Sequence, residues 1–158
     1  MKRLSVLLLI AMMSLASFSQ EVNVLLKQET RLTARGNDAE LILKAMVQYK
    51  DGGETVDLQS MKLNLDGTTR IADVAEVKVY TSGLEDCANN RFHESASLVG
   101  SCAPQSGDFI CELNGQLLKG INYLWLAVRV SNNAVEGNSI DMSCLEIATS
   151  EGEKKKKN

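Results

Sequence analysis

The chain has 158 residues, enough for one domain with a hydrophobic core but too few for two domains of ordinary size. Its formal net charge is −3. Residues 1–19 hold two basic residues and no acid, so the remainder has 15 Lys and Arg against 20 Asp and Glu. Binding to nucleic acid requires clustered Lys and Arg on the fold itself, and this acidic balance argues against such a partner.

The first 19 residues have the three parts of a secretory signal peptide. Lys2 and Arg3 are basic, Leu4 to Leu15 is apolar, and Ser17-Phe18-Ser19 offers small residues at the two positions that a signal peptidase reads. The apolar run is too short for a membrane span. We therefore expect cleavage before Gln20 and an exported protein that lies in the periplasm, on the cell surface or outside the cell.

Alternation of apolar and polar residues, the pattern of a strand with one buried face, recurs through the rest of the chain. Loops are expected over residues 30–39 and 84–95, and the connection from Thr68 to Asp73 holds at most one helical turn. Turns are expected at Asp51-Gly52-Gly53, Asp66-Gly67 and Asn114-Gly115. The expected strands are 22–26, 41–50, 54–58, 61–65, 77–79, 96–100, 109–113, 120–130 and 139–148.

The strand expected from Gly120 to Val130 is the most apolar one after the signal region. One face holds Leu124, Leu126, Val128 and Val130, and the other face holds Tyr123, Trp125, Ala127 and Arg129. With no convincing helix, about eight or nine such strands predict an all-β antiparallel sandwich. We assign it to residues 20–149, and residues 150–158, which have no apolar side chain, to a charged disordered tail.

Four cysteines follow the signal region: Cys87, Cys102, Cys111 and Cys144. An even number in an exported chain predicts up to two disulfides. Zinc binding is the alternative, but no pair has the C-x-x-C spacing and the chain has a single histidine. We favour a Cys102–Cys111 pair, because Pro104 and Gly107 place a turn between the two, which leaves Cys87 with Cys144.

Tyr123, Trp125 and Arg129 are the candidate ligand-binding residues. Aromatic rings bind the apolar faces of sugars, and a neighbouring arginine suits an acidic sugar. The alternative is that the rings belong to the core, since Trp and Tyr are highly buried on average and few aromatic residues are present to fill a core.

Other polar residues point to no site. The acids form no D-x-D-x-D-G calcium loop, so we expect no metal and no cofactor. Glu85-Asp86 has no patterned partner, and His93 has no nucleophile motif near it. The lysines of residues 154–157 are interpreted as a solubilising tail.

Two segments in fixed order resemble a known family. The first, from Leu63 to Gly83, is LNLDGTTRIADVAEVKVYTSG, with a G-T-T turn and a K-V-Y strand that closes on glycine. The second, from Leu117 to Asp141, is LLKGINYLWLAVRVSNNAVEGNSID, with G-x-N-Y-x-W-L and G-N-x-I-D elements. Together they resemble the N-terminal domain that precedes the β-propeller of BNR-repeat neuraminidases, over residues 22–149. The resemblance implies an Ig-like β-sandwich with an accessory role.

The resemblance does not extend to catalysis. The Asp boxes of the propeller, S-x-D-x-G-x-x-W, do not occur in the sequence. Sialidase chemistry needs an arginine clamp for the substrate carboxylate, a tyrosine nucleophile with a glutamate partner, and an acid/base aspartate. The arginines after the signal region lie outside such contexts: Arg31, Arg35, Arg70, Arg91 and Arg129. We therefore expect no enzymatic activity.

The leading hypothesis is a non-catalytic exported module that binds glycans or docks with a sialidase-type, glycan-degrading protein. A structural or adhesive surface protein, acting through sheet-edge contacts with other chains, is the alternative. An enzyme of unrecognised type is the third hypothesis, because a fold by itself hosts many functions.

Overall fold

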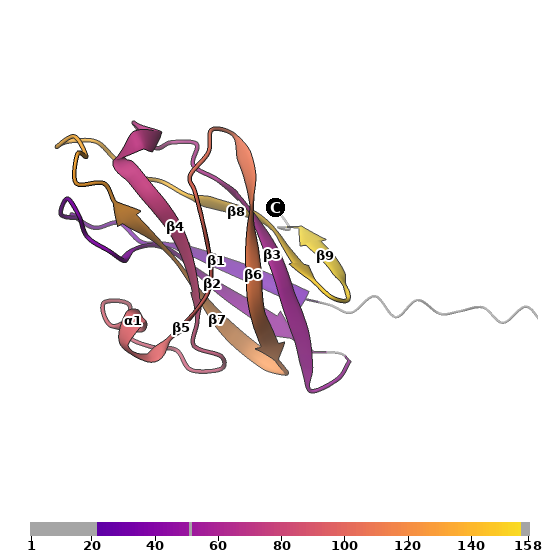
Figure 1. Cartoon of the computed structure of the whole chain (residues 1–158). Coiled ribbons are helices and arrows are strands. Elements are labelled where there is room, and N and C mark those ends of the chain that lie inside the picture. Colours follow the sequence, from indigo (N-terminus) through magenta and orange to yellow (C-terminus); the bar gives the residue numbers. More distant parts are fainter. Residues whose placement is uncertain (1–21, 51, 156–158) are drawn as a thin grey trace, which may run out of the picture.

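Two antiparallel sheets face each other in the computed structural model, which describes residues 22–50 and 52–155 (Figure 1). In spatial order, the larger sheet contains β1 (Val22–Gln28), β2 (Glu40–Tyr49), β7 (Gly120–Val130), β4 (Val74–Thr81) and β5 (Ser97–Cys102). The smaller contains β6 (Asp108–Leu118), β3 (Thr55–Asn64), β8 (Ser143–Thr149) and β9 (Gly152–Lys155). A 3-10 turn, η1 (Ile71–Asp73), and a short helix, α1 (Phe92–Ser95), complete the described part. The predicted all-β sandwich of about eight or nine strands is confirmed.

The main core lies between the sheets, and β7 contributes one full face to it. Leu124, Leu126, Val128 and Val130 are all buried there, as their alternation predicts. β7 is the central strand of the larger sheet, hydrogen-bonded to β2 on one side and to β4 on the other. Burying each such side chain stabilises the fold by about 1.5–3 kcal/mol, so this strand anchors the sandwich.

The hairpin between β6 and β7 turns at Gly120, which has a φ of +126°. Asn122 is fully buried beside it, accepts a hydrogen bond from the Leu118 backbone N–H at 2.8 Å and donates one to the Leu118 carbonyl at 2.7 Å. Both backbone groups of Leu118 are therefore satisfied by one side chain, which holds the strand start in place.

Two local predictions are wrong. Asn114-Gly115 is not a turn but lies inside β6, where Gly115 leaves room for Val99 of β5: a Cβ there would lie 2.9 Å from Val99 Cγ1. The strands expected over 54–58 and 61–65 form a single strand, β3, whose pairing shifts register between Leu58 and Ser60. The shift marks a β-bulge, and the polar residues at the centre of β3 made the sequence look like two separate strands.

The predicted tail also differs in part from the structure. Residues 152–155 pair with β8 as β9, with Glu146 opposite Lys155 and Thr149 opposite Gly152. Edge strands accept charged residues because the pairing uses backbone groups, so composition did not reveal this strand. The predicted signal peptide over residues 1–19 lies outside the described residues.

No disulfide joins the four cysteines, all of which lie in the described part. Cys144 is in the core between the sheets, whereas Cys87 packs on the outer face of the larger sheet. The larger sheet separates these two residues, so the structure does not bring together the predicted Cys87–Cys144 pair. Cys102 and Cys111 do lie beside each other, where β5 meets β6.

Candidate functional site

A second apolar cluster covers the outer face of the larger sheet. It consists of Leu41, Cys87, Phe92, Trp125 and Ala127, and we call it the outer cluster. Two of these side chains come from the covering segment, residues 82–96, which includes α1 and runs across the sheet. The part of the outer face of β7 around Trp125 and Ala127 is therefore a small core of its own and not a solvent-exposed surface.

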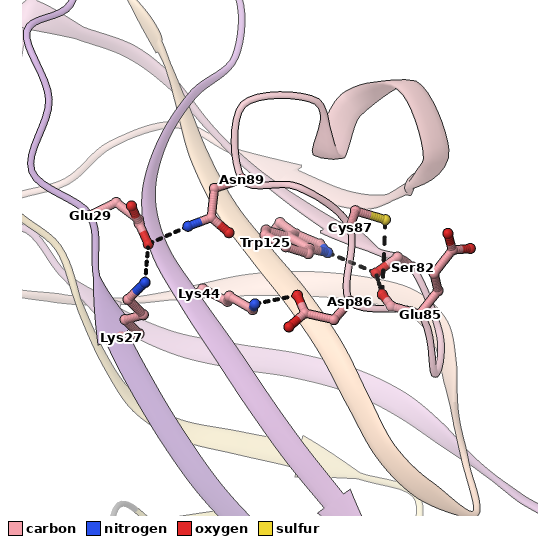
Figure 2. Close-up of polar contacts among 9 residues, drawn as sticks. All are labelled: Lys27, Glu29, Lys44, Ser82, Glu85, Asp86, Cys87, Asn89 and Trp125. Carbon is pink, nitrogen blue, oxygen red and sulfur yellow. Dashed lines mark hydrogen bonds and ion pairs between the residues drawn. The ribbon is translucent and has the colours of Figure 1, made fainter.

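Trp125 lies at the centre of the outer cluster with 0% of its surface exposed. Its ring stacks on Phe92 with centroids 5.7 Å apart and planes 13° from parallel. The indole N–H donates a hydrogen bond of 2.8 Å to the Ser82 hydroxyl oxygen (Figure 2). Both the faces and the polar tip of this side chain are thus occupied within the chain.

Lys44 supports the same cluster from β2, and its side chain is nearly buried. Its ammonium nitrogen lies 4.8 Å from the centroid of the Trp125 ring and 5.0 Å from that of Tyr123. It also forms an ion pair with Asp86 of the covering segment (Figure 2). A carboxylate and two ring faces together offset the cost of removing this charge from water.

A third contact fixes the covering segment to the end of β1. The Asn89 amide donates a hydrogen bond of 2.6 Å to Glu29, whose carboxylate also pairs with Lys27 at 3.3 Å (Figure 2). The segment is therefore held along its length by Ser82, Asp86 and Asn89. Only tertiary contacts reveal this, because the partners lie on β7, on β2 and just past the end of β1.

The predicted ligand-binding residues occupy unequal positions. Tyr123 is partly buried beside Lys44, and Trp125 is wholly covered. Arg129 is partly exposed and pairs with Glu76 of β4 at 3.3 Å. A sugar on this surface would contact Tyr123 and Arg129 but not the indole of Trp125. The ligand-binding site therefore stays a prediction, reduced to Tyr123 and Arg129 as the residues in direct contact.

A cavity opens elsewhere, at the end of the sandwich where two long connections meet. Its volume is about 760 Å³, and we call it the end cavity. The walls come mainly from the connection between β1 and β2 and from the connection between β7 and β8. Its lining is rich in hydrogen-bonding groups, with Gln28, Thr30, Thr33, Asn138 and Ser139 among them. The sequence predicted a loop over residues 30–39 in the first connection, but nothing in it indicated that the two connections converge, and residues 139–142 of the second were expected to belong to a strand.

Two of the acids that line the end cavity are engaged in hydrogen bonds. Asp73 is 2% exposed and accepts hydrogen bonds from the Asn138 amide at 2.7 Å and from the Val135 backbone N–H at 3.2 Å. Asp141 accepts a hydrogen bond of 2.6 Å from the Gln28 amide. These bonds shape the walls and partly satisfy the negative charge of the cavity.

One cation and two apolar side chains remain available there. The side chain of Arg35 is exposed and makes no ion pair or hydrogen bond with any residue that the structure describes. Arg31, by contrast, pairs with Glu29 at 3.8 Å. Leu32 is fully exposed, at 103%, and Val135 is 48% exposed. The end cavity therefore offers a guanidinium group, hydroxyl and amide partners, and apolar surface within one hollow.

Two of the other polar residues singled out from the sequence, Asp86 and His93, have structural contacts. Asp86 pairs with Lys44, and His93 of α1 packs edge-on against Phe92 with ring centroids 5.5 Å apart. Over residues 22–50 and 52–155, no group of three or more His, Cys, Asp or Glu is placed to hold a metal ion. Within the same ranges, no helix has the length and apolar character to cross a membrane.

Comparison with known proteins agrees with the fold. Among solved structures, the Hadza microbial sialidase Hz136 is similar, with a TM-score of 0.66 and 15% sequence identity over 82% of this chain. The chain corresponds to 29% of the length of that protein. No curated protein matched. A family described as the N-terminal domain of BNR-repeat neuraminidase matches residues 19–153, and this chain belongs to that family.

Proposed function

We propose that the chain is an exported, non-catalytic accessory module that binds glycans for a sialidase-type, glycan-degrading protein. The observation that carries the proposal is the match to the neuraminidase N-terminal domain over residues 19–153. The similar chain of known structure is a sialidase, and the part that resembles this chain makes up 29% of it. We expect a domain of this kind to contribute binding or docking, and the chemistry to belong to the catalytic part of a sialidase-type protein.

The end cavity is the place where we expect a glycan to bind. Sugars are recognised by convergent hydroxyl and amide partners together with apolar surface, and a cavity of several hundred Å³ suits a small ligand. Arg35 would form paired, charge-assisted hydrogen bonds with the carboxylate of an acidic sugar, because its guanidinium presents a planar fork of donors. Leu32 and Val135 would cover the C–H face of the ring.

The surface at Tyr123 and Arg129 is the competing location. Arg129 is partly exposed there, although binding would require it to leave or share its ion pair with Glu76. Trp125 would act only from below, by supporting Tyr123. We place this surface second because the ring best suited to a sugar is covered by Phe92.

The test is a titration of residues 20–158 with 3′-sialyllactose and with lactose, followed by calorimetry and by NMR chemical shifts. We expect saturable binding of sialyllactose that Arg35→Ala weakens at least about tenfold, as expected for loss of a charge-assisted pair. Arg129→Ala is the matched control and should leave the affinity unchanged. The reverse pattern would move the site to the outer sheet surface. Failure of every sialylated and neutral glycan to bind would refute glycan binding.

Docking with the catalytic protein is a second candidate that an exposed apolar patch favours. Leu84, Leu118 and Ile121 are 50%, 38% and 45% exposed; Leu84 lies near Gly120 and Leu118 lies near Gly83, at the same end of the fold. Exposed apolar groups of this kind mark contact surfaces. Binding to a sialidase catalytic domain that Leu84→Glu abolishes, with glycan binding unaffected, would separate docking from glycan recognition.

The adhesive alternative depends on open sheet edges. β1 and β9 each pair on one side only within the described part, and such edges can add a strand from another chain. Concentration-dependent assembly in sizing experiments would support it. Export is tested separately: N-terminal sequencing of the protein from its native host should begin at or near Gln20.

A further inference from the structure

The two sheets meet at a seam formed by β5 and β6. β5 is the last strand of the larger sheet and β6 is the first strand of the smaller one, and the two pack side by side without forming a ladder (Figure 1). Cys102 is the last residue of β5, and Cys111 lies within β6. Both side chains belong to the main core, and the two thiols lie close enough to interact across the seam.

Glycines bring the two strands of the seam unusually close. A Cβ atom on Gly100 would collide with the Glu112 carbonyl oxygen, and one on Gly115 would lie 2.9 Å from Val99 Cγ1. Such distances leave no room for a side chain between the backbones. The seam therefore holds the two cysteines in contact as part of the fold, independently of any loop motion.

The two thiols differ in access and in acidity. Cys111 is 0% exposed, while Cys102 is partly exposed at the end of its strand. The contact with Cys111 lowers the pKa of the Cys102 thiol, and the same contact together with burial raises the pKa of Cys111. Cys102 is thus the thiol that an external reagent reaches and that ionises first.

We propose that Cys102 and Cys111 form a disulfide that links the two sheets when the chain meets a disulfide donor. The Cys102 thiolate attacks one sulfur of the donor, forming a mixed disulfide and releasing one donor thiol. The donor thiolate released in that step takes the proton of Cys111, and the Cys111 sulfur attacks the Cys102 sulfur, which releases the second half of the donor as a thiolate that is protonated by solvent. The donor disulfide is reduced by two electrons in this exchange. No glycan takes part in the reaction, so the link does not depend on the proposed function.

Peptide mapping gives a direct test because both cysteines fall in one tryptic peptide. Residues 92–119 lie between Arg91 and Lys119 with no other basic cleavage site, whereas Cys87 and Cys144 fall in other peptides. Residues 20–158 would be reduced, incubated with oxidised glutathione, then denatured and alkylated. We expect peptide 92–119 to be unalkylated and lighter by two hydrogen atoms than its reduced form. Alkylation at both sites, a stable glutathione adduct on Cys102 or a link to Cys87 or Cys144 would overturn the proposal.

Matched variants separate the cross-link from other effects of oxidation. Oxidation should raise the urea midpoint of the wild type, because the link restricts the unfolded chain. Cys102→Ala, at a partly exposed position, should fold and lose this gain. Cys87→Ala should retain the gain, since its side chain lies on the other side of the larger sheet. An equal gain in Cys102→Ala would refute the proposal.

Discussion

Phe92 is the residue whose removal would expose the outer cluster most directly. Its ring is 2% exposed, stacks on Trp125 and meets Tyr80 edge-on with centroids 5.2 Å apart. Truncation of a buried Phe to Ala costs about 3–5 kcal/mol. We expect about 3 kcal/mol for Phe92→Ala, because water can enter a cluster that lies beneath a single surface segment. With an m-value of about 1.5 kcal/mol/M, the urea midpoint should fall by about 2 M.

Trp125 is the only tryptophan, so its emission reports on this one place. The native wild type should emit at short wavelength and resist quenching by acrylamide, whereas native Phe92→Ala should shift to longer wavelength and quench more readily. Phe109→Ala is the matched control, since Phe109 is 4% exposed in the main core and far from the indole. It should lower the midpoint and leave the native emission unchanged. Unchanged emission and a midpoint shift below about 0.5 M in Phe92→Ala would refute the role assigned to the covering segment.

Three further changes test other parts of the fold. Gly115→Ala should destabilise the chain by about 1–3 kcal/mol through overpacking at the seam, and Val99→Ala should reduce that loss in the double variant; purely additive losses in urea unfolding would contradict the contact. Asp73→Ala should cost about 2 kcal/mol by removing two hydrogen bonds to the connection after β7, and amide exchange there should accelerate; unchanged exchange would count against this role. The Asn64 hydrogen bond holds the pKa of Asp108 below 3.8, so the stabilisation by this carboxylate is present above pH 3.8 and is lost as the pH falls through the native pKa. Asp108→Asn should lack that loss of stability at acid pH. Identical pH profiles of thermal unfolding in the wild type and the variant would exclude this role for Asp108.

Most of the sandwich was accessible from the sequence because strand alternation is a local property. β7 illustrates this: the residues assigned to one face all lie in the main core. The same alternation could not tell what covers the other face. Burial of Trp125 depends on Phe92, which is 33 positions away, and on Lys44 from a different strand. A period of two identifies a face, but the identity of its cover is a long-range contact.

The failures have the same origin. Asn114-Gly115 has the composition of a turn, yet β6 continues through it because Val99 of a neighbouring strand needs the space. The lysines of β9 have the composition of a tail, yet the free edge of β8 pairs with their backbone. The end cavity joins connections about a hundred residues apart, so its lining has no sequence motif.

Fold class, strand order along the chain and family followed from local patterns, because alternation, turn residues and the two motifs each depend on neighbours in sequence. The cover on Trp125, the cavity beside Arg35 and the contact between Cys102 and Cys111 emerged only with the tertiary structure. Each of these brings together segments that belong to different strands or loops. Which segments meet is decided by sheet order and by the packing of the two sheets, which no local stretch of residues encodes.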